Sequence, residues 1–588
     1  MPAITRDKLI ETLESIALLL ELKGENPFKT RAYTNAARTI EVFSGDFLAV
    51  ARAGELESID GIGKAIATKL TELVTTGTLP YFEKLRAEFP PTIFELFGIP
   101  GLGPKKIKAV WEQLGVSDLM ALEEAAKDGR IAALPGFGEK TATNLIAAID
   151  QRKKHSGYFL LGDAAPIAET ILEDLKALPD VSQASVAGSY RRRKEVLHDL
   201  DLIVAGKNPA EVIWYFTHHA QVETIIAQGP TKASVRFASG LQCDLRVVTN
   251  EEYPFALNYF TGSKEHNVIM RSRALDRGWT LNEYRLGPVE ARATGRNAEV
   301  ETPEDIPKIY QESDLYRALG LDYVEPELRE GRGEIAAAEA GTLPRLIELE
   351  NLRGTFHNHT TASDGRSSLS EMADAAMEIG LEYLGIADHS KSSVQAYGLT
   401  EEKLLAQVEE IRNLNATYKG FQLLAGTECD ILKDGSLDFS DEILSQLDYV
   451  VASVHSSFTQ SEADMTKRLI RAMENPHVTM LGHLTGRVLL SREAYAVDIP
   501  AVIEAAAATG TIIELNASPY RLDMDWRWWQ LAREKGVRCA INPDAHHASS
   551  LQHLWFGVAL ARKGWLEKND VVNCLPLEKI QMELRRKR

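Results

Sequence analysis

Asp199 and Asp201 carry the clearest chemical signal in the sequence. They open the segment 199–204, in which acidic and apolar residues alternate before the segment turns fully apolar. This pattern predicts a half-buried strand that runs into a buried one. Side chains two positions apart on a strand face the same way, so the two carboxylates lie side by side and repel each other unless a cation lies between them. Hard divalent ions with oxygen ligands fit such a pair.

A phosphate-binding segment precedes this pair. Gly188 and Ser189 offer backbone N–H groups and a hydroxyl, and arginines follow at 191–193. All of these groups bind phosphate oxygens. A third carboxylate, Asp244, lies in the predicted strand 241–248, from which it could reach the same ions and take the proton of an attacking hydroxyl. A single Asp on a strand is often only a solvated edge residue, but metal carboxylates beside a triphosphate cradle predict phosphoryl or nucleotidyl transfer.

These residues and the segment Tyr259-Phe260-Thr261-Gly262-Ser263 resemble the family X DNA polymerases, the group that includes DNA polymerase beta. The resemblance covers the chain up to about residue 320. It implies that Asp199 and Asp201 bind two metal ions, that Asp244 binds the catalytic one, and that all three aspartates are catalytic.

The same resemblance implies a set of nucleotide and template contacts. The triphosphate would be held by the Gly-Ser turn and Arg192, and the aromatic pair at 259–260 would pack on the sugar and discourage a ribose hydroxyl. Asn267 would contact the base, and Arg271 the template strand. The nucleotide-binding residues are then Gly188, Ser189, Arg192, Tyr259, Phe260, Gly262 and Asn267.

The N-terminal third contains a repeated turn, in which two glycines flank one apolar residue just before a helical pattern. Such a turn directs the N–H groups of a helix N-terminus toward a phosphate. The pattern resembles helix-hairpin-helix units, which bind the DNA backbone without reading its sequence. The DNA-binding residues that it implies are Gly61, Gly63, Gly101, Gly103, Gly136 and Gly138.

The first of these units resembles the small lyase domain of the same family. Lys69 matches the lysine that forms a Schiff base with a 5′-deoxyribose phosphate, and a nucleophilic amine needs a pKa lowered by burial or by a neighbouring cation. Lys29 and Lys64 could supply that cation. Ala65 departs from the family, in which a supporting lysine is usual, so a simple contact with the 5′-phosphate is the alternative role of Lys69.

A different pattern begins near residue 351, where apolar strands alternate with helical stretches. Seven such units predict a closed parallel barrel, whose chemistry collects at the C-terminal ends of the strands. Six of the seven strands end in a histidine or carboxylate, and mixed imidazole and carboxylate ligands suit Zn, Mn or Fe(II) better than Mg alone. The predicted strands are 354–359, 383–389, 422–430, 449–455, 479–483, 511–516 and 538–546.

This pattern resembles the polymerase and histidinol phosphatase (PHP) family of trinuclear phosphoesterases. A lone histidine is more often a buried, hydrogen-bonded side chain, but here nine candidate ligands converge. The resemblance implies one ion on His357, His359, Glu428 and Asp544, a second on Asp364, His389 and His546, and a third on Glu428, His455 and His483, with Glu428 bridging.

The predicted fold class is multidomain α/β: helical helix-hairpin-helix domains, a nucleotidyltransferase palm with a mixed sheet and helices, and a seven-stranded (β/α) PHP barrel. The expected domains are a lyase-like helical domain at 1–82, a helix-hairpin-helix subdomain at 83–153, the palm at 154–250, a nucleotide-selection subdomain at 251–322, an acidic linker with a short helix at 323–350, and the PHP domain at 351–588.

Composition is consistent with an enzyme that acts on DNA in the cytoplasm. The net charge of −18 looks unfavourable for a DNA-binding protein, but most of it comes from residues beyond 300, and phosphate contacts depend on local basic patches such as 105–108 and 191–194. The four cysteines show no CxxC spacing, which argues against a disulfide framework. No apolar run is long enough for a membrane span, and the N-terminus does not resemble a signal peptide.

The function expected from the resemblance is template-directed gap filling in DNA repair by a bacterial family X polymerase with a C-terminal PHP domain. The PHP domain would be a Mn-dependent 3′–5′ exonuclease that could also cleave at abasic sites. Two Mg or Mn ions are expected in the palm and up to three Mn or Zn ions in the PHP site. The expected partners are gapped or primed DNA and dNTPs, no membrane is involved, and the chain is expected to be a monomer.

Two alternatives remain open on the sequence. One is a DNA-end-binding repair scaffold with a weak polymerase and a structural PHP domain. The other is a small-molecule phosphatase fused to a nucleotidyltransferase.

Overall fold

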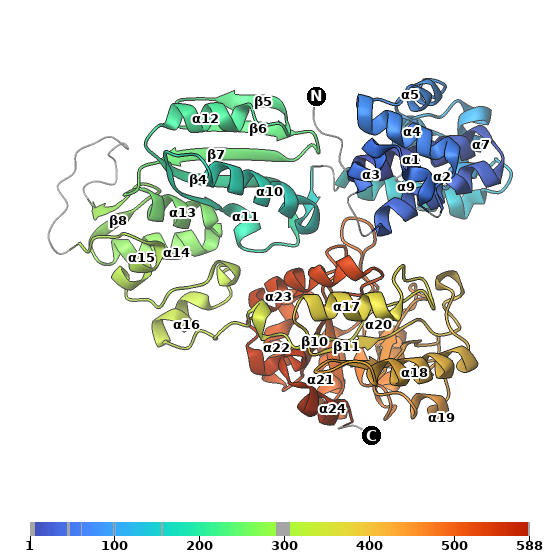
Figure 1. The fold of residues 1–588 in the computed structure, drawn as a ribbon. Coiled ribbons are helices and arrows are strands. Elements are labelled where there is room, and N and C mark those ends of the chain that lie inside the picture. The colour runs from blue at the N-terminus through green and yellow to red at the C-terminus, as the bar shows by residue number, and fades with distance from the viewer. Residues whose placement is uncertain are drawn as a thin grey trace. The chain divides into compact units, whose positions relative to one another are not determined.

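The computed structural model describes residues 6–43, 47–59, 61–97, 99, 101–154, 157–289 and 306–585. The chain divides into two compact units, Met1–Ser156 and Gly157–Arg588. Figure 1 shows helices in the first unit and a mixture of helices and sheets in the second.

The helices of the first unit pack their apolar faces into one core. Helix α4 shows the principle, because Ile66, Leu70 and Leu73 are spaced three or four residues apart and so lie on one face. The helices are α1 (Arg6–Lys23), α2 (Pro27–Val42), α3 (Phe47–Ala53), α4 (Lys64–Thr76), α5 (Pro80–Arg86), α6 (Ile93–Phe97), α7 (Pro104–Leu114), α8 (Leu119–Lys127) and α9 (Gly138–Lys154).

The second unit begins with a five-stranded sheet in the order β2-β4-β7-β6-β5. Strands β4 and β7 are parallel, and the other neighbours are antiparallel, which confirms the predicted mixed sheet. The strands are β2 (Val181–Val186), β4 (Asp199–Gly206), β5 (Val222–Gln228), β6 (Lys232–Phe237) and β7 (Gln242–Val248); a separate ribbon pairs β1 (Phe159–Leu160) with β3 (Val196–Leu197).

Alternation along β4 decides which face of this sheet carries the chemistry. Its even-numbered side chains pack with α10 (Leu161–Lys176) and α12 (Pro209–Thr217) in one core. Ile203 and Ala205 pack instead with α13 (Tyr253–Thr261). Because Asp199 and Asp201 share the odd-numbered face, their carboxylates lie on the side of the sheet that α13 covers.

A further core follows α13 in the chain. It contains residues of α14 (Lys264–Leu275), α15 (Glu312–Ala318) and the antiparallel ribbon of β8 (Trp279–Leu281) and β9 (Leu286–Pro288).

The segment 323–350 is packed rather than being the acidic linker that we expected. Its short helix, α16 (Glu334–Ala340), is present, and apolar residues of the segment join the same core as α14 and α15. Arg329 is fully buried and pairs with Glu312. Glu327 lies 2.8 Å from the Arg562 guanidinium. The acidic residues that suggested a linker are therefore partly compensated by arginines.

The C-terminal part alternates short strands with helices, as predicted for a PHP domain (Figure 1). All strand pairs are parallel, in two sheets ordered β10-β11-β12 and β13-β14-β15-β16-β17. The strands are β10 (Gly354–Thr355), β11 (Tyr383–Ile386), β12 (Gln422–Ala425), β13 (Glu428–Asp430), β14 (Val451–Ser453), β15 (Met480–Leu481), β16 (Ile512–Asn516) and β17 (Cys539–Asn542).

The helices around these strands are α17 (Leu369–Glu378), α18 (Glu401–Asn415), α19 (Asp441–Leu444), α20 (Glu462–Met473), α21 (Ile499–Thr509), α22 (Trp529–Glu534), α23 (Leu554–Lys563) and α24 (Leu577–Leu584). The strands are shorter than expected, so several predicted ligands lie just beyond the strand ends. A parallel bridge between Asn358 and Ala545 links the segments that follow β10 and β17. The two outer strands are thus neighbours, as a closed barrel would require.

No helix in the described ranges is long and apolar enough to cross a membrane. All four cysteines are buried and free, in agreement with the absence of a disulfide pattern in the sequence.

Candidate active sites

The palm brings its three predicted carboxylates together. Asp201 on β4 lies directly opposite Asp244 on the parallel strand β7, and Asp199 lies on the same face of β4. Gly188 approaches so closely that a Cβ built there would lie 2.3 Å from an Asp201 carboxylate oxygen, and its φ of +61° suits glycine. The turn and the carboxylates therefore form one compact group.

The electrostatics of this group favour a bound cation. Burial, with the neighbouring Asp199 and Asp244 carboxylates, raises the pKa of Asp201 to about 7. Burial and Asp244 also raise the pKa of Asp199. Carboxylates that resist ionisation together are stabilised when a divalent ion lies between them, so the donor set fits oxygen-liganded metals.

A cavity of about 360 Å³ adjoins these carboxylates. All of the predicted nucleotide-binding residues line it, as does the predicted template contact. The lining residues are Gly188, Ser189, Arg192, Asp199, Asp201, Tyr259, Phe260, Gly262, Lys264, Asn267 and Arg271. Lys264 was missed in the sequence analysis. A basic residue at the start of a helix, directly after Gly262-Ser263, was a usable signal.

Asp244 lines a second cavity, of about 240 Å³, together with Lys232 and Arg246. Arg246 lies over the Phe260 ring, 4.3 Å from its centre. Asp244 thus adjoins a separate cavity, while Asp199 and Asp201 adjoin the first. This arrangement suits a site in which the two reacting groups approach from different directions.

Hydrogen bonds fix the helices around the first cavity. Asn267 Nδ2 donates to the Tyr259 carbonyl at 2.7 Å, and Arg271 Nε donates to the Asn267 carbonyl at 3.3 Å. Arg192 is largely buried and donates to Glu330 at 3.0 Å and to the Thr261 carbonyl. These hydrogen bonds hold in place the residues of α13 and α14 that are predicted to contact the nucleotide and the template.

The PHP part gathers all nine predicted ligands around Glu428. One Glu428 oxygen lies 3.3 Å from His357 Nε2, 3.1 Å from His455 Nε2 and 2.9 Å from His483 Nε2. The other lies 2.8 Å from His389 Nδ1. A central carboxylate with four imidazoles around it can bridge neighbouring ions.

Among the described residues, four groups have ligand atoms close enough to hold an ion. They resemble the expected sets but share members: His359 also joins the Asp364 group, His357 joins His483, and His389 joins His455. The groups are His359, Asp364, His389 and His546; His357, His359 and Asp544; His357, Glu428 and His483; and His389, Glu428 and His455.

The donor set fits metal binding. Both ring nitrogens of His359 are buried and, within the described ranges, have no hydrogen-bond partner, although Nε2 lies 3.3 Å from an Asp544 oxygen. Burial, with the neighbouring His546 and His389, lowers the pKa of His359, so its imidazole is neutral and keeps a free lone pair. Neutral imidazoles beside ionised carboxylates are the form that binds metal.

Residues that the sequence reasoning missed orient these ligands. Glu514 is fully buried and lies 2.7 Å from His357 Nδ1, and its other oxygen accepts from the His483 backbone N–H at 3.0 Å. Asp430 lies 3.1 Å from His455 Nδ1, and Asn516 donates to Asp544 at 3.1 Å. Such partners fix the tautomer and direction of a ligating ring. A lone Glu in an otherwise apolar strand was the available signal for Glu514.

The metal cluster opens into a cavity of about 210 Å³. Arg521 lines it and contacts Asp544, with its Nε 3.4 Å from a carboxylate oxygen. A cation at the rim of a carboxylate and imidazole cluster suits an anionic substrate such as a phosphate ester.

The predicted DNA-binding turns of the first unit share the conformation of their first glycine. Gly61, Gly101 and Gly136 each have a positive φ. Gly63 and Gly103 precede α4 and α7, and no described side chain caps the start of either helix. The N–H groups there are available to a phosphate.

Lys69 lies beside two tyrosine rings. Its Nζ is 4.8 Å from the centre of the Tyr81 ring and 6.0 Å from that of Tyr33. Burial, followed by the neighbouring Lys29, lowers the pKa of Lys69. Lys29 thus supplies the cation that we expected.

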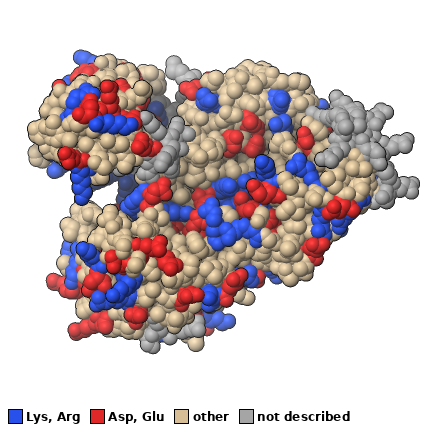
Figure 2. All heavy atoms as spheres, turned by 180° about the vertical axis from the view of Figure 1, so that it is seen from behind, with Lys and Arg blue, Asp and Glu red and all other residues tan. Residues whose placement is uncertain are grey.

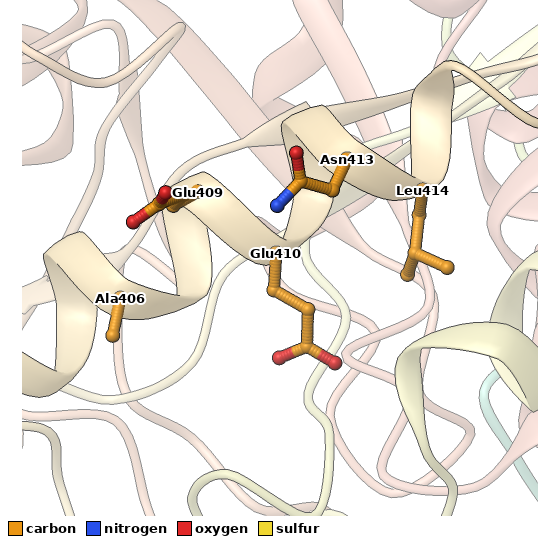
Figure 3. A pocket seen from close by; sticks show the side chains of 5 residues that line it. All are labelled: Ala406, Glu409, Glu410, Asn413 and Leu414. Carbon is orange, nitrogen blue, oxygen red and sulfur yellow. The ribbon is translucent and has the colours of Figure 1, made fainter.

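Another cavity, of about 400 Å³, is lined by few side chains that could take part in catalysis. All of its lining side chains lie along the single helix α18, as Figure 3 shows. They are Ala406, Glu409, Glu410, Asn413 and Leu414. Because these residues include no lysine, arginine or histidine, this cavity is not a candidate site for phosphate chemistry.

Family models match four parts of the chain. They are a helix-hairpin-helix domain at residues 4–79, a SAM-like helix-hairpin-helix tandem at 93–151, a DNA polymerase beta thumb at 256–330 and a PHP domain at 355–518. These matches confirm the helix-hairpin-helix and PHP predictions and define a protein that combines a beta-type polymerase with a PHP domain.

A protein of Bacillus subtilis described as DNA polymerase/3′-5′ exonuclease PolX is 39% identical over 98% of this chain and 99% of its own length. The chain belongs to this family of family X polymerases that carry a PHP domain. A "Probable phosphatase" of Caldanaerobacter subterraneus is 30% identical over 32% of this chain and 74% of its own length. A solved ternary complex of Leishmania infantum polymerase beta is 24% identical, covers 41% of this chain and 98% of its own, and has a TM-score of 0.26.

Proposed function

We propose that the chain is a template-directed DNA polymerase that fills gaps during DNA repair, with a 3′–5′ exonuclease in its PHP domain. The observation that carries the proposal is the register of β4 and β7, which sets Asp201 opposite Asp244 beside a cavity lined by phosphate-binding residues. The second, separate cluster of nine metal-type ligands gives the same chain a hydrolytic site.

In the palm, the residues divide the work of nucleotidyl transfer. Asp199 and Asp201 would hold two divalent ions, Mg or Mn, and Asp244 would hold one of them and take the proton of the primer 3′-hydroxyl. The ions, when bound, stabilise the charge that develops on the transferred phosphoryl group. Gly188, Ser189 and Arg192 would bind the triphosphate through N–H, hydroxyl and guanidinium donors. Tyr259 and Phe260 would pack against the sugar, where a ribose hydroxyl would meet them.

In the PHP domain, the ligands grouped around Glu428 would hold up to three Mn or Zn ions. Bound ions lower the pKa of a coordinated water and polarise the scissile phosphate. Glu514, Asp430 and Asn516 would hold the ligands in position, and Arg521 would bind the phosphate that is cleaved. The same chemistry could open DNA at abasic sites.

The first unit would hold gapped or primed DNA by its backbone. Three glycine turns, two of them followed by helix starts without a side-chain cap, suit phosphates without regard to sequence. On the face drawn in Figure 2, basic and acidic side chains are interspersed rather than separated into large fields, so local contacts rather than net charge would attract DNA. We propose a monomer that acts in the cytoplasm on the bacterial chromosome.

A 5′-deoxyribose phosphate lyase is a second candidate function, favoured by the lowered pKa of Lys69. Borohydride should trap the chain on a 5′-deoxyribose phosphate end, and Lys69→Ala should abolish trapping. Because Lys29 lowers the pKa of Lys69, Lys29→Met should move the pH dependence of trapping to higher pH. Equal trapping by Lys69→Ala and the wild type would leave Lys69 as a phosphate contact.

The principal test is primer extension on DNA with a one-nucleotide gap. The wild type should add the nucleotide complementary to the template, in Mg or Mn, and should shorten an unpaired 3′ end. A DNA-end-binding scaffold would bind the gap and do neither. A metabolite phosphatase would release phosphate from small esters but would not respond to the template.

A further inference from the structure

A buried lysine of the PHP domain contacts Arg192, which lines the nucleotide cavity of the palm. Lys563, the last residue of α23, is fully buried. Its Nζ donates to Glu330 Oε1 at 2.6 Å and to the main-chain carbonyl of Arg192 at 2.8 Å. It also lies 4.6 Å from the centre of the Trp526 ring. A buried ammonium is costly, so these contacts must compensate it closely.

Glu330 connects Lys563 to the side chain of Arg192. Arg192 Nε donates to the same Glu330 oxygen at 3.0 Å, and Nη1 donates to the Thr261 carbonyl. One PHP lysine therefore holds Arg192 at its backbone directly and at its guanidinium through Glu330. The guanidinium has further N–H donors for a phosphate, and Arg192 lines the nucleotide cavity.

The charged groups of this cluster are two cations, Lys563 and Arg192, and the anion Glu330 between them. Burial lowers the pKa of Lys563 to about 8, although Glu330 raises it, so the amine is mostly protonated at neutral pH. Burial would raise the pKa of Glu330, but Lys563 and Arg192 hold it below its usual value. Two buried cations thus contact one buried anion, Glu330, and the largely buried Glu195 carboxylate also raises the pKa of Lys563. Lys194 lies 3.8 Å from Glu330 but is 41% exposed, so solvent screens it.

We propose that Lys563 is a positioning residue for the polymerase: it neutralises Glu330 and so leaves the Arg192 guanidinium free to bind the triphosphate of an incoming nucleotide. Without Lys563, Glu330 would neutralise Arg192 instead. The inference rests on the proposed polymerase function, and it gives the PHP domain a second role that is independent of its own metal cluster.

The test compares gap filling by the full-length wild type and by variants of Lys563, Glu330 and Arg192. Lys563→Met keeps the side-chain volume and should raise the KM for all four dNTPs by roughly tenfold or more, the effect of losing one hydrogen bond to a charged group, with little change in kcat. The double variant Lys563→Met/Glu330→Gln removes the competing anion as well, and its KM should return toward the wild-type value. Arg192→Ala should raise all four KM values and should not respond to Glu330→Gln.

Arg562→Met is the matched control. Arg562 is the neighbour of Lys563 on α23 and also joins the PHP domain to the preceding segment, through Glu327 at 2.8 Å and Glu348 at 2.6 Å. It is not expected to change the KM for dNTPs, because neither partner contacts Arg192. Exonuclease activity should be equal in Lys563→Met, the double variant and the wild type.

Equilibrium binding of dATP with Mg, measured on the same proteins, separates the possible failures. Unchanged KM in Lys563→Met, or a double variant no better than the single one, would overturn the inference while gap filling stands. A wild type that binds dATP but extends no primer would overturn the proposed function, and the order of the dissociation constants would still decide the inference. A wild type that binds no dATP would overturn both. If Lys563→Met fails to fold, the double variant against Glu330→Gln alone decides, since equal KM values are then expected.

Discussion

The palm and PHP sites surround their buried carboxylates with different groups. In the palm, three carboxylates share one face of a sheet, and burial raises the pKa of Asp201 to about 7. In the PHP cluster, one buried carboxylate, Glu428, is surrounded by four imidazoles within 3.3 Å. The palm group is made of carboxylates alone, whereas the PHP cluster combines imidazoles with the carboxylates of Asp364, Glu428 and Asp544.

The ligand atoms lead to different metals. Oxygen ligands alone suit Mg and Mn, while imidazole and carboxylate together suit Mn and Zn. We therefore expect the chain to polymerise in Mg and to hydrolyse in Mn. The predictions below test this contrast, starting with the largest expected effect.

The palm prediction concerns Asp199→Ala and Asp201→Ala. Each should slow nucleotide addition. The expected loss of transition-state stabilisation is at least ~3 kcal/mol, because a metal-binding carboxylate acts electrostatically at the reacting centre. Single-turnover gap filling measures the effect. Extension at the wild-type rate by the double variant would show that the chemistry lies elsewhere.

The metal-content prediction concerns His359→Ala and Asp544→Ala. Protein reconstituted with Mn or Zn and then desalted should retain ions in the wild type and fewer in either variant, because His359 belongs to two of the ligand groups. The 3′–5′ exonuclease of the wild type should prefer Mn to Mg. Elemental analysis that finds the same tightly bound metal in both variants would contradict the assignment.

The smallest of these effects is expected for Glu514→Gln. Glu514 is not a ligand but fixes His357 through a 2.7 Å contact, and loss of such a partner usually costs about 10–100-fold in metal affinity or activity. Exonuclease activity should fall within that range and should recover in part at higher Mn concentration. Glu514 contacts His357 and His483 in the PHP cluster, so gap filling should not change; a fall in both activities would mean that Glu514 supports the fold instead.

The sequence allowed the palm carboxylates to be predicted because strand alternation places Asp199 and Asp201 on one face, and the PHP ligand sets came from the resemblance to the PHP family. It also suggested the fold class. Strand lengths were overestimated, since His357 and His359 lie beyond β10 rather than within it. The longer-range contacts could not be predicted, because Glu330 pairs with Lys563 across a separation of 233 residues that local patterns cannot register.

The same limitation explains the segment 323–350. Its composition, rich in Glu, Ala and Gly, predicted an acidic linker, but Arg562 and Arg329 pair with glutamates in or beside it, and its apolar residues are buried. The amino-acid composition of a segment cannot show that an arginine distant in the sequence pairs with one of its glutamates. Glu514 was missed for a related reason, because one acidic residue in a buried strand has meaning only once its histidine partner is known.

The central claim is that two independent metal sites on one chain carry the two activities. The most direct measurement follows extension and shortening of a 5′-labelled primer in two gapped duplexes, one with a paired and one with an unpaired 3′ end, for the wild type, Asp201→Asn and His359→Ala. We expect Asp201→Asn to shorten the primer but not extend it, and His359→Ala to extend a paired primer but not shorten an unpaired one. Loss of both activities in either folded variant, or loss of the wrong one, would contradict the account.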